Sequence, residues 1–121
     1  MKIATAAYPL DWFADWAAYE AKLTAWVAEA AQAGAELLVF PEYGAMELAS
    51  LAGAKVAGDL RGSIEAVSER VGAADAVLSA LALRFGVHIL GPSAPVVERG
   101  LVVNRARLFA PSGASDYQDK Q

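Results

Sequence analysis

One acidic side chain, Glu42, directly follows a short and wholly apolar run, Leu37 to Phe40. Such a run predicts a central strand covered on both faces, and Pro41 ends it because proline has no N–H to donate to a neighbouring strand. Open α/β sheets gather their ligands at the carboxyl ends of their strands, so a carboxylate there is placed to contact a ligand. A solvated loop glutamate would have the same local sequence, and Glu42 alone leaves both interpretations open.

A second candidate, Ser93, lies in the segment Gly91-Pro92-Ser93-Ala94-Pro95, which approaches the G-x-S-x-G pattern of serine hydrolases. That pattern needs a sharp turn into a helix, whereas here proline replaces the last glycine and a strand follows. The only histidine, His88, precedes Ser93, so no Ser/His/Asp arrangement is predicted. The apolar surroundings of His88 favour a packed, hydrogen-bonded side chain over a catalyst.

The composition argues against several classes of site. The 121 residues include no cysteine and one histidine, so neither a thiolate metal site nor a zinc site is expected within them. The sequence has no Walker loop and no G-x-G-x-x-G, and we expect no cofactor. A formal net charge of −4 without a basic cluster argues against nucleic acid as a partner.

The only neighbouring pair of basic residues in a predicted strand is Arg105 and Arg107, which share one strand face. They could bind an anion, but pairing with carboxylates is the more ordinary use of such residues. The segment Tyr117 to Lys120 is polar and, taken in isolation, predicts a solvated end.

The first part of the chain has the pattern of a βαβ unit. Lys2 to Ala7 predicts a strand, and from Asp15 onward apolar residues recur every three or four positions, which indicates an amphipathic helix. Asp11 or Asp15 can cap this helix, and Gly34 can close it. The strand Leu37 to Phe40 follows at once, so the two strands should lie parallel and the fold class is α/β.

The next elements are a short helix, a loop and a second long helix. The short helix is expected from Tyr43 to Ala52 and the loop from Gly53 to Gly62. The long helix should begin near Ser63 as N-cap and end at Gly86, with Gly72 as a point where it could break or kink.

The last part of the chain predicts strands. The third strand is Val87 to Leu90, and a three-residue connection, Glu98-Arg99-Gly100, indicates a hairpin whose second strand is antiparallel to the first. The second strand of the hairpin should end at the Pro111-Ser112-Gly113 turn. Ser115 to Gln121 is polar, and no helix or strand is expected there.

The length fits one domain or part of one. A hydrophobic fraction of 56% is high for a small domain, and further chain or a partner is expected to cover some of it. Charged residues interrupt every long apolar window, so neither a membrane span nor membrane association is expected. The N-terminus does not resemble a signal peptide, and we expect a cytoplasmic protein.

Five segments together, in this order and spacing, resemble the carbon–nitrogen hydrolase (nitrilase) family. The Phe40-Pro41-Glu42-Tyr43 segment is similar to the aliphatic amidase branch in particular. The segments are Lys2 to Pro9, Leu38 to Tyr43, Gly86 to Gly91, Asn104 to Gly113, and Asp119-Lys120.

This resemblance implies an αββα sandwich and a Glu-Lys-Cys catalytic set. Glu42 matches the family's general base, and Lys120 matches the lysine that stabilises the oxyanion. Tyr43, beside the base, is expected to contact substrate. The family's cysteine lies further along than Gln121, so residues 1–121 are expected to be the N-terminal part of one hydrolase domain.

The resemblance therefore predicts a thiol-dependent amidohydrolase that cleaves non-peptide C–N bonds in an amide, nitrile or carbamoyl substrate. Without the cysteine, this chain alone is expected to be inactive. A homo-oligomer, or association with the missing C-terminal part, is expected. The alternative is a non-catalytic α/β assembly or binding module that keeps the fold without the nucleophile.

Overall fold

The elements follow the α/β order that the sequence predicts. This computed structural model describes residues 1–120, and Gln121 lies outside the described residues. In chain order the elements are β1 (Ile3–Thr5), α1 (Trp16–Gln32), β2 (Leu37–Val39), the 3-10 helix η1 (Gly44–Ala52), α2 (Ala54–Ala57), α3 (Leu60–Phe85), β3 (His88–Leu90), β4 (Ala94–Glu98), β5 (Leu101–Phe109) and β6 (Ser115–Lys120).

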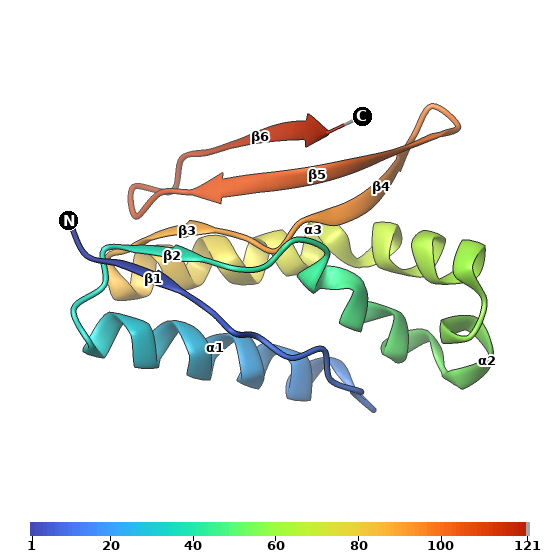
Figure 1. Cartoon of the computed structure of the whole chain (residues 1–121), viewed down its shortest axis with the longest axis horizontal. Helices are drawn as coiled ribbons and strands as arrows, with labels where there is room; N and C mark the ends of the chain where they lie inside the picture. The colour runs from blue at the N-terminus through green and yellow to red at the C-terminus, as the bar shows by residue number, and fades with distance from the viewer. Residues whose placement is uncertain (121) are drawn as a thin grey trace.

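The strands form one mixed sheet. β1, β2 and β3 are parallel neighbours in that order, as the βαβ pattern predicts. β5 then pairs antiparallel with both β3 and β4, and β6 pairs with β5. In Figure 1 α1 lies below the parallel strands, and α3 runs along the sheet where it overlaps β2 and β3 in the view. The two long helices contact each other, and α3 contacts β3, β4 and β5, so the described residues form one helical layer and one sheet layer.

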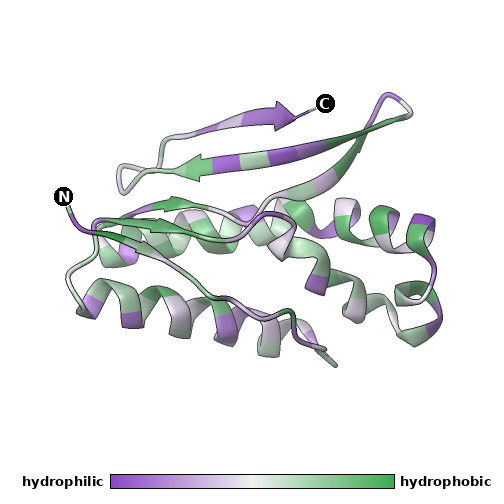
Figure 2. Ribbon diagram, viewed as in Figure 1, coloured by the Kyte–Doolittle hydropathy of each residue, from purple (hydrophilic) through white to green (hydrophobic). Residues whose placement is uncertain are grey.

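The core lies between these two layers. Every second residue of a strand faces the helices, and Leu38, Ile89 and Phe109 are buried there. Tyr19, Leu23 and Val27 form the buried stripe of α1. In Figure 2 the three parallel strands are mainly hydrophobic, whereas β6 is hydrophilic along most of its length.

The caps of α1 agree with the sequence analysis. The Asp15 side chain accepts a hydrogen bond from the Ala18 N–H at 2.9 Å, so Asp15 and not Asp11 is the N-cap. Gly34 follows the last turn with a φ of 90°, a conformation that favours glycine. None of the helices within residues 1–120 is long and apolar enough to cross a membrane.

The predicted start of the second long helix was wrong. Asp59 is the N-cap, accepting from the Gly62 N–H at 2.7 Å, whereas the Ser63 hydroxyl donates backward to the Ala57 carbonyl oxygen at 2.9 Å. The predicted loop therefore contains α2 and the first turn of α3. Helix α3 continues through Gly72, where an added Cβ would meet no other atom.

The predicted hairpin is present with a tighter turn. Glu98 pairs with Leu101, so the connection is two residues, Arg99 and Gly100, both with positive φ. This geometry suits the twist of a two-residue hairpin.

The expectation that residues 115–121 contain no strand was wrong for Ser115 to Lys120. β6 hydrogen-bonds along β5 over six residue pairs. The sequence does not reveal β6 because its side chains are mostly exposed, and backbone pairing needs no apolar pattern.

Candidate functional site

Glu42 lies in a tight turn at the carboxyl end of the parallel strands. The Phe40 N–H donates to the Leu90 carbonyl oxygen at 3.0 Å, which continues the β2–β3 pairing by one residue. Pro41 then ends the pairing, and the Gly44 N–H closes the turn on the Pro41 carbonyl oxygen at 3.1 Å. The strand end predicted from the sequence thus fixes the position from which Glu42 projects.

The structure brings Lys120 to Glu42. β6 lies against β5 in a register that pairs Lys120 with Asn104. The Lys120 ammonium nitrogen is 3.6 Å from the Glu42 carboxylate, and the Asn104 Nδ2 donates to the same carboxylate oxygen at 3.5 Å. A carboxylate, an ammonium and an amide thus meet near the carboxyl end of the parallel strands.

A cavity of about 450 Å³ lies beside this pair. The Glu42 and Lys120 side chains are 58% and 76% exposed, so both remain accessible in the described chain. The cavity is lined by Phe40, Glu42, Leu90, Gly91, Ser93, Asn104, Ala106, Gln118, Asp119 and Lys120.

An arginine holds β6 in place next to Lys120. The Arg105 Nε and a terminal nitrogen bind the two carboxylate oxygens of Asp119 at 2.7 and 3.0 Å, and Glu98 binds the same guanidinium at 3.0 Å. The hydrogen bond from Arg105 holds the pKa of Asp119 below its usual range. The predicted carboxylate pairing of this strand is confirmed, because Arg107 also contacts a carboxylate, Asp75, at 3.3 Å.

Tyr43, the predicted substrate contact, contributes its backbone to this region. Its φ of 57° is left-handed, and its N–H donates to the Ser93 hydroxyl oxygen at 2.6 Å. Its side chain is about half exposed and does not line the cavity beside Glu42. Contact between the Tyr43 side chain and substrate stays a prediction.

The expectation of a packed His88 was wrong. His88 is exposed on the sheet face away from the helices, because strand alternation turns its neighbour Ile89 into the core. Among residues 1–120 there is no group of three or more histidine, cysteine, aspartate and glutamate side chains placed to hold a metal ion.

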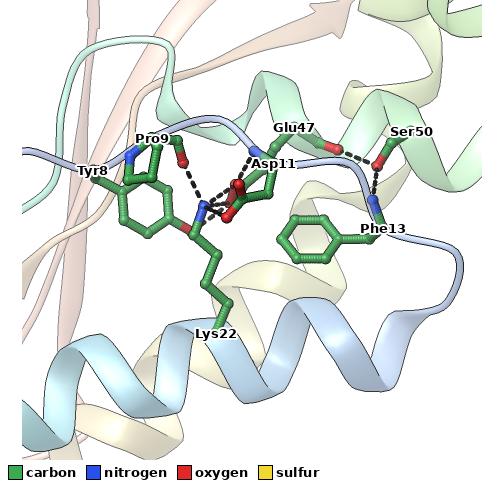
Figure 3. Close-up of polar contacts among 7 residues, drawn as sticks. All are labelled: Tyr8, Pro9, Asp11, Phe13, Lys22, Glu47 and Ser50. Atoms are coloured by element: carbon green, nitrogen blue, oxygen red, sulfur yellow. Dashed lines mark hydrogen bonds and ion pairs between the residues drawn. The ribbon is translucent and has the colours of Figure 1, made fainter.

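A buried charged cluster, not found from the sequence, joins α1, η1 and the segment after β1 (Figure 3). The Lys22 ammonium is 2.7 Å from the Glu47 carboxylate, and the Tyr8 hydroxyl donates to that carboxylate. Burial, and then the contact with Glu47, raises the pKa of Tyr8 well above its usual value, so the phenol keeps its proton. Glu47 is the only charged residue from Gly44 to Ala52, and such a lone charge in an apolar segment is the signal that could have revealed it.

Comparison with known structures identifies the fold. No protein-family model and no curated protein matches the chain. The structure is similar to a CN-hydrolase superfamily protein from Xanthomonas campestris, crystallised with an arsenic adduct in its active site, with a TM-score of 0.63 and 22% identity over 99% of this chain. It is also similar to a carbon–nitrogen hydrolase from Helicobacter pylori, with a TM-score of 0.69 and 18% identity over 98% of this chain.

These similarities confirm the predicted fold resemblance. The chain has the fold of carbon–nitrogen hydrolase superfamily proteins over the part that is matched, and it spans 38% of the length of each of these two neighbours. At this level of identity the comparison defines the fold, and the chemistry has to be argued from the site.

Proposed function

We propose that this chain supplies the glutamate and the lysine of a thiol-dependent carbon–nitrogen hydrolase that cleaves non-peptide C–N bonds of amide, nitrile or carbamoyl substrates. The observation that carries the proposal is the contact between Glu42 and Lys120 at the edge of a cavity. The two residues lie far apart in the sequence, and an exposed ion pair of this kind adds little to stability. Its position beside a cavity favours a role in chemistry.

The two side chains suit complementary steps. A thiol is mostly protonated at neutral pH, so a carboxylate such as Glu42 has to accept its proton before the sulfur attacks the carbon of the substrate. Negative charge then develops on the carbonyl oxygen of an amide or carbamoyl substrate, or on the nitrogen of a nitrile, where the Lys120 ammonium can stabilise it. The chain has no cysteine, so we propose that the nucleophile comes from residues outside these 121.

Asn104 supports this assignment by its contact with Glu42. Its Nδ2 donates to the carboxylate, while its Oδ1 is buried without a hydrogen-bond partner in the part of the chain that the structure describes. Turning the amide over would place that oxygen against the Glu42 carboxylate, which is repulsive. We therefore propose that Asn104 orients the base.

The test compares two glutamates that flank the same strand. In a longer protein that carries the cysteine, Glu42→Gln should lower ammonia release from simple amides by at least about 100-fold, the usual contribution of a general base. The exposed Glu36, which precedes β2, provides the matched Glu36→Gln control and should leave turnover unchanged. Undiminished turnover in Glu42→Gln would remove Glu42 from the proposed role.

A partner surface also fits this proposal. The sheet face away from the helices carries Ile3 and Leu108, 56% and 41% exposed, and no described element covers it. We propose that the cysteine-bearing part of the protein packs on this face. Sedimentation of residues 1–121 mixed with that part should show a complex, and self-association of residues 1–121 alone would favour the homo-oligomer instead.

The alternative function is a non-catalytic assembly or binding module, which the absence of cysteine favours. Residues 1–121 alone should form no acyl-enzyme with an activated ester, because no thiol is present; detection of one by mass spectrometry would contradict both proposals. A cysteine-bearing longer protein without hydrolase activity would favour the module.

A further inference from the structure

The loops that follow two neighbouring parallel strands are joined beside Glu42. The turn after β2 contains Tyr43 and Gly44, and the segment after β3 contains Pro92 and Ser93. The Tyr43 N–H donates to the Ser93 hydroxyl oxygen at 2.6 Å, across fifty residues of sequence. Ser93 itself is 7% exposed and lines the cavity with Glu42.

This hydrogen bond acts on a strained residue. Tyr43 has φ 57° and ψ 15°, a left-handed conformation that glycine adopts readily but that is uncommon for a residue with a large side chain. Residues held in such conformations need support from the surrounding structure, and they gather at functional sites. The Ser93 hydroxyl supports Tyr43 directly, one residue away from Glu42.

The loops also meet too closely for any larger residue at position 44. A Cβ added to Gly44 would lie 2.8 Å from the Pro92 Cβ and 3.3 Å from the Pro41 Cγ. The turn therefore cannot shift toward Pro92, and the hydrogen bond to Ser93 limits movement away from it. Together the two contacts define where the turn sits.

We infer that Ser93 is a positioning residue: by holding the Tyr43 backbone in its left-handed conformation, its hydroxyl directs the Glu42 carboxylate toward Lys120 and the cavity. This gives the Gly91-Pro92-Ser93 segment a role other than that of a nucleophile. The inference deepens the proposed function, which assigns Glu42 as the base, but its geometric content can be tested without catalysis.

The test uses zero-length cross-linking of the 121-residue chain with a water-soluble carbodiimide. The reagent joins a carboxylate to a contacting lysine amine as an amide, with loss of one water, and peptide mass spectrometry measures the yield. Unmodified chain should give the Glu42–Lys120 amide. Lys22 and Asp11 are 2.9 Å apart and make no hydrogen bond to Ser93, so they provide an internal reference pair.

Ser93→Ala should lower the Glu42–Lys120 yield about fivefold relative to the reference pair, the factor expected for one ordinary hydrogen bond. Exchange of the Tyr43 amide hydrogen should become faster by a similar factor. Ser93→Thr keeps the hydroxyl and should restore the yield. Ser68, whose hydroxyl oxygen accepts from the Val97 N–H at 2.8 Å, provides the matched Ser68→Ala control, which should change neither quantity.

Faster Tyr43 exchange in Ser93→Ala with an unchanged Glu42–Lys120 yield would overturn the inference, since Ser93 would then stabilise the loop without directing Glu42. An equal loss of yield in Ser68→Ala would overturn it as well. If the cross-link depends on Ser93 while Glu42→Gln keeps full turnover in the longer protein, the proposed function fails and the positioning inference stands.

Discussion

Two lysine–glutamate pairs of this chain differ in almost every physical respect. Lys22 and Glu47 are 2.7 Å apart, with side chains 9% and 0% exposed. Lys120 and Glu42 are 3.6 Å apart, with side chains 76% and 58% exposed. The buried pair also contacts Tyr8 and Asp11 (Figure 3), whereas the exposed pair borders a cavity.

The difference separates a structural role from a chemical one. Charges removed from water must be fully paired, so Lys22 and Glu47 spend their hydrogen-bonding capacity on each other and on their neighbours. They hold α1 and the segment after β1 against η1, the helix that begins two residues after Glu42. The exposed pair keeps unused donors and acceptors, which a substrate could engage. Burial therefore decides whether a lysine–glutamate pair has a structural role or is available for chemistry.

The largest effect expected from this comparison is on stability. Glu47→Ala should lower the free energy of unfolding by about 3 kcal/mol, because it leaves the Lys22 ammonium and the Tyr8 hydroxyl without their main partner. Urea denaturation measures this change. Glu20→Ala, at an exposed site on α1, should change it by less than about 0.5 kcal/mol. Equal effects of the two substitutions would contradict a structural role for the buried pair.

A smaller and pH-dependent effect is expected next to the exposed pair. In the folded chain the pKa of Asp119 lies below its ordinary value of 3.8 because Arg105 binds it. The stabilisation is therefore complete above the ordinary pKa and is lost as the pH falls through the folded value. Melting temperatures of the unmodified chain and of Asp119→Asn should differ at neutral pH and converge in acid below about pH 4.

That convergence would also affect the site. Protonation of Asp119 should loosen β6 from β5, so the Glu42–Lys120 cross-link should decline over the same acid range more than the Lys22–Asp11 cross-link does. A constant difference in melting temperature down to strong acid would show that the Arg105 contact does not stabilise the fold.

The smallest effect on stability is expected for the exposed pair, and it gives the most direct comparison with the buried pair. Glu42→Gln and Lys120→Met should each change the free energy of unfolding by less than about 0.5 kcal/mol, since the pair is exposed and its contact is long. Urea denaturation alongside Glu47→Ala provides the comparison. A loss from Glu42→Gln as large as that from Glu47→Ala would mean that Glu42 stabilises the fold, and the exposure of Glu42 would then not indicate a role in chemistry.

Much of this architecture could be predicted from local signals. The cap at Asp15, the apolar run before Pro41 and the glycine at the hairpin turn each act within a few residues, where sequence patterns are informative. The start of α3 was misplaced because Asp59 and Ser63 are both good capping residues, and only the hydrogen bonds distinguish them. β6 was missed because a polar strand pairs through its backbone.

For the site, the sequence by itself determined that Glu42 follows the end of a strand and that these 121 residues contain no cysteine. Through the ordered motifs, it also predicted Lys120 as the second catalytic residue beside Glu42. Only the tertiary structure decided that Lys120 and Asn104 contact Glu42. It also decided that Ser93 binds the backbone of Tyr43, and that Lys22 and Glu47 are buried together. The physical reason is range: caps and turns depend on adjacent residues, whereas these contacts depend on the register and packing of strands and helices far apart in sequence.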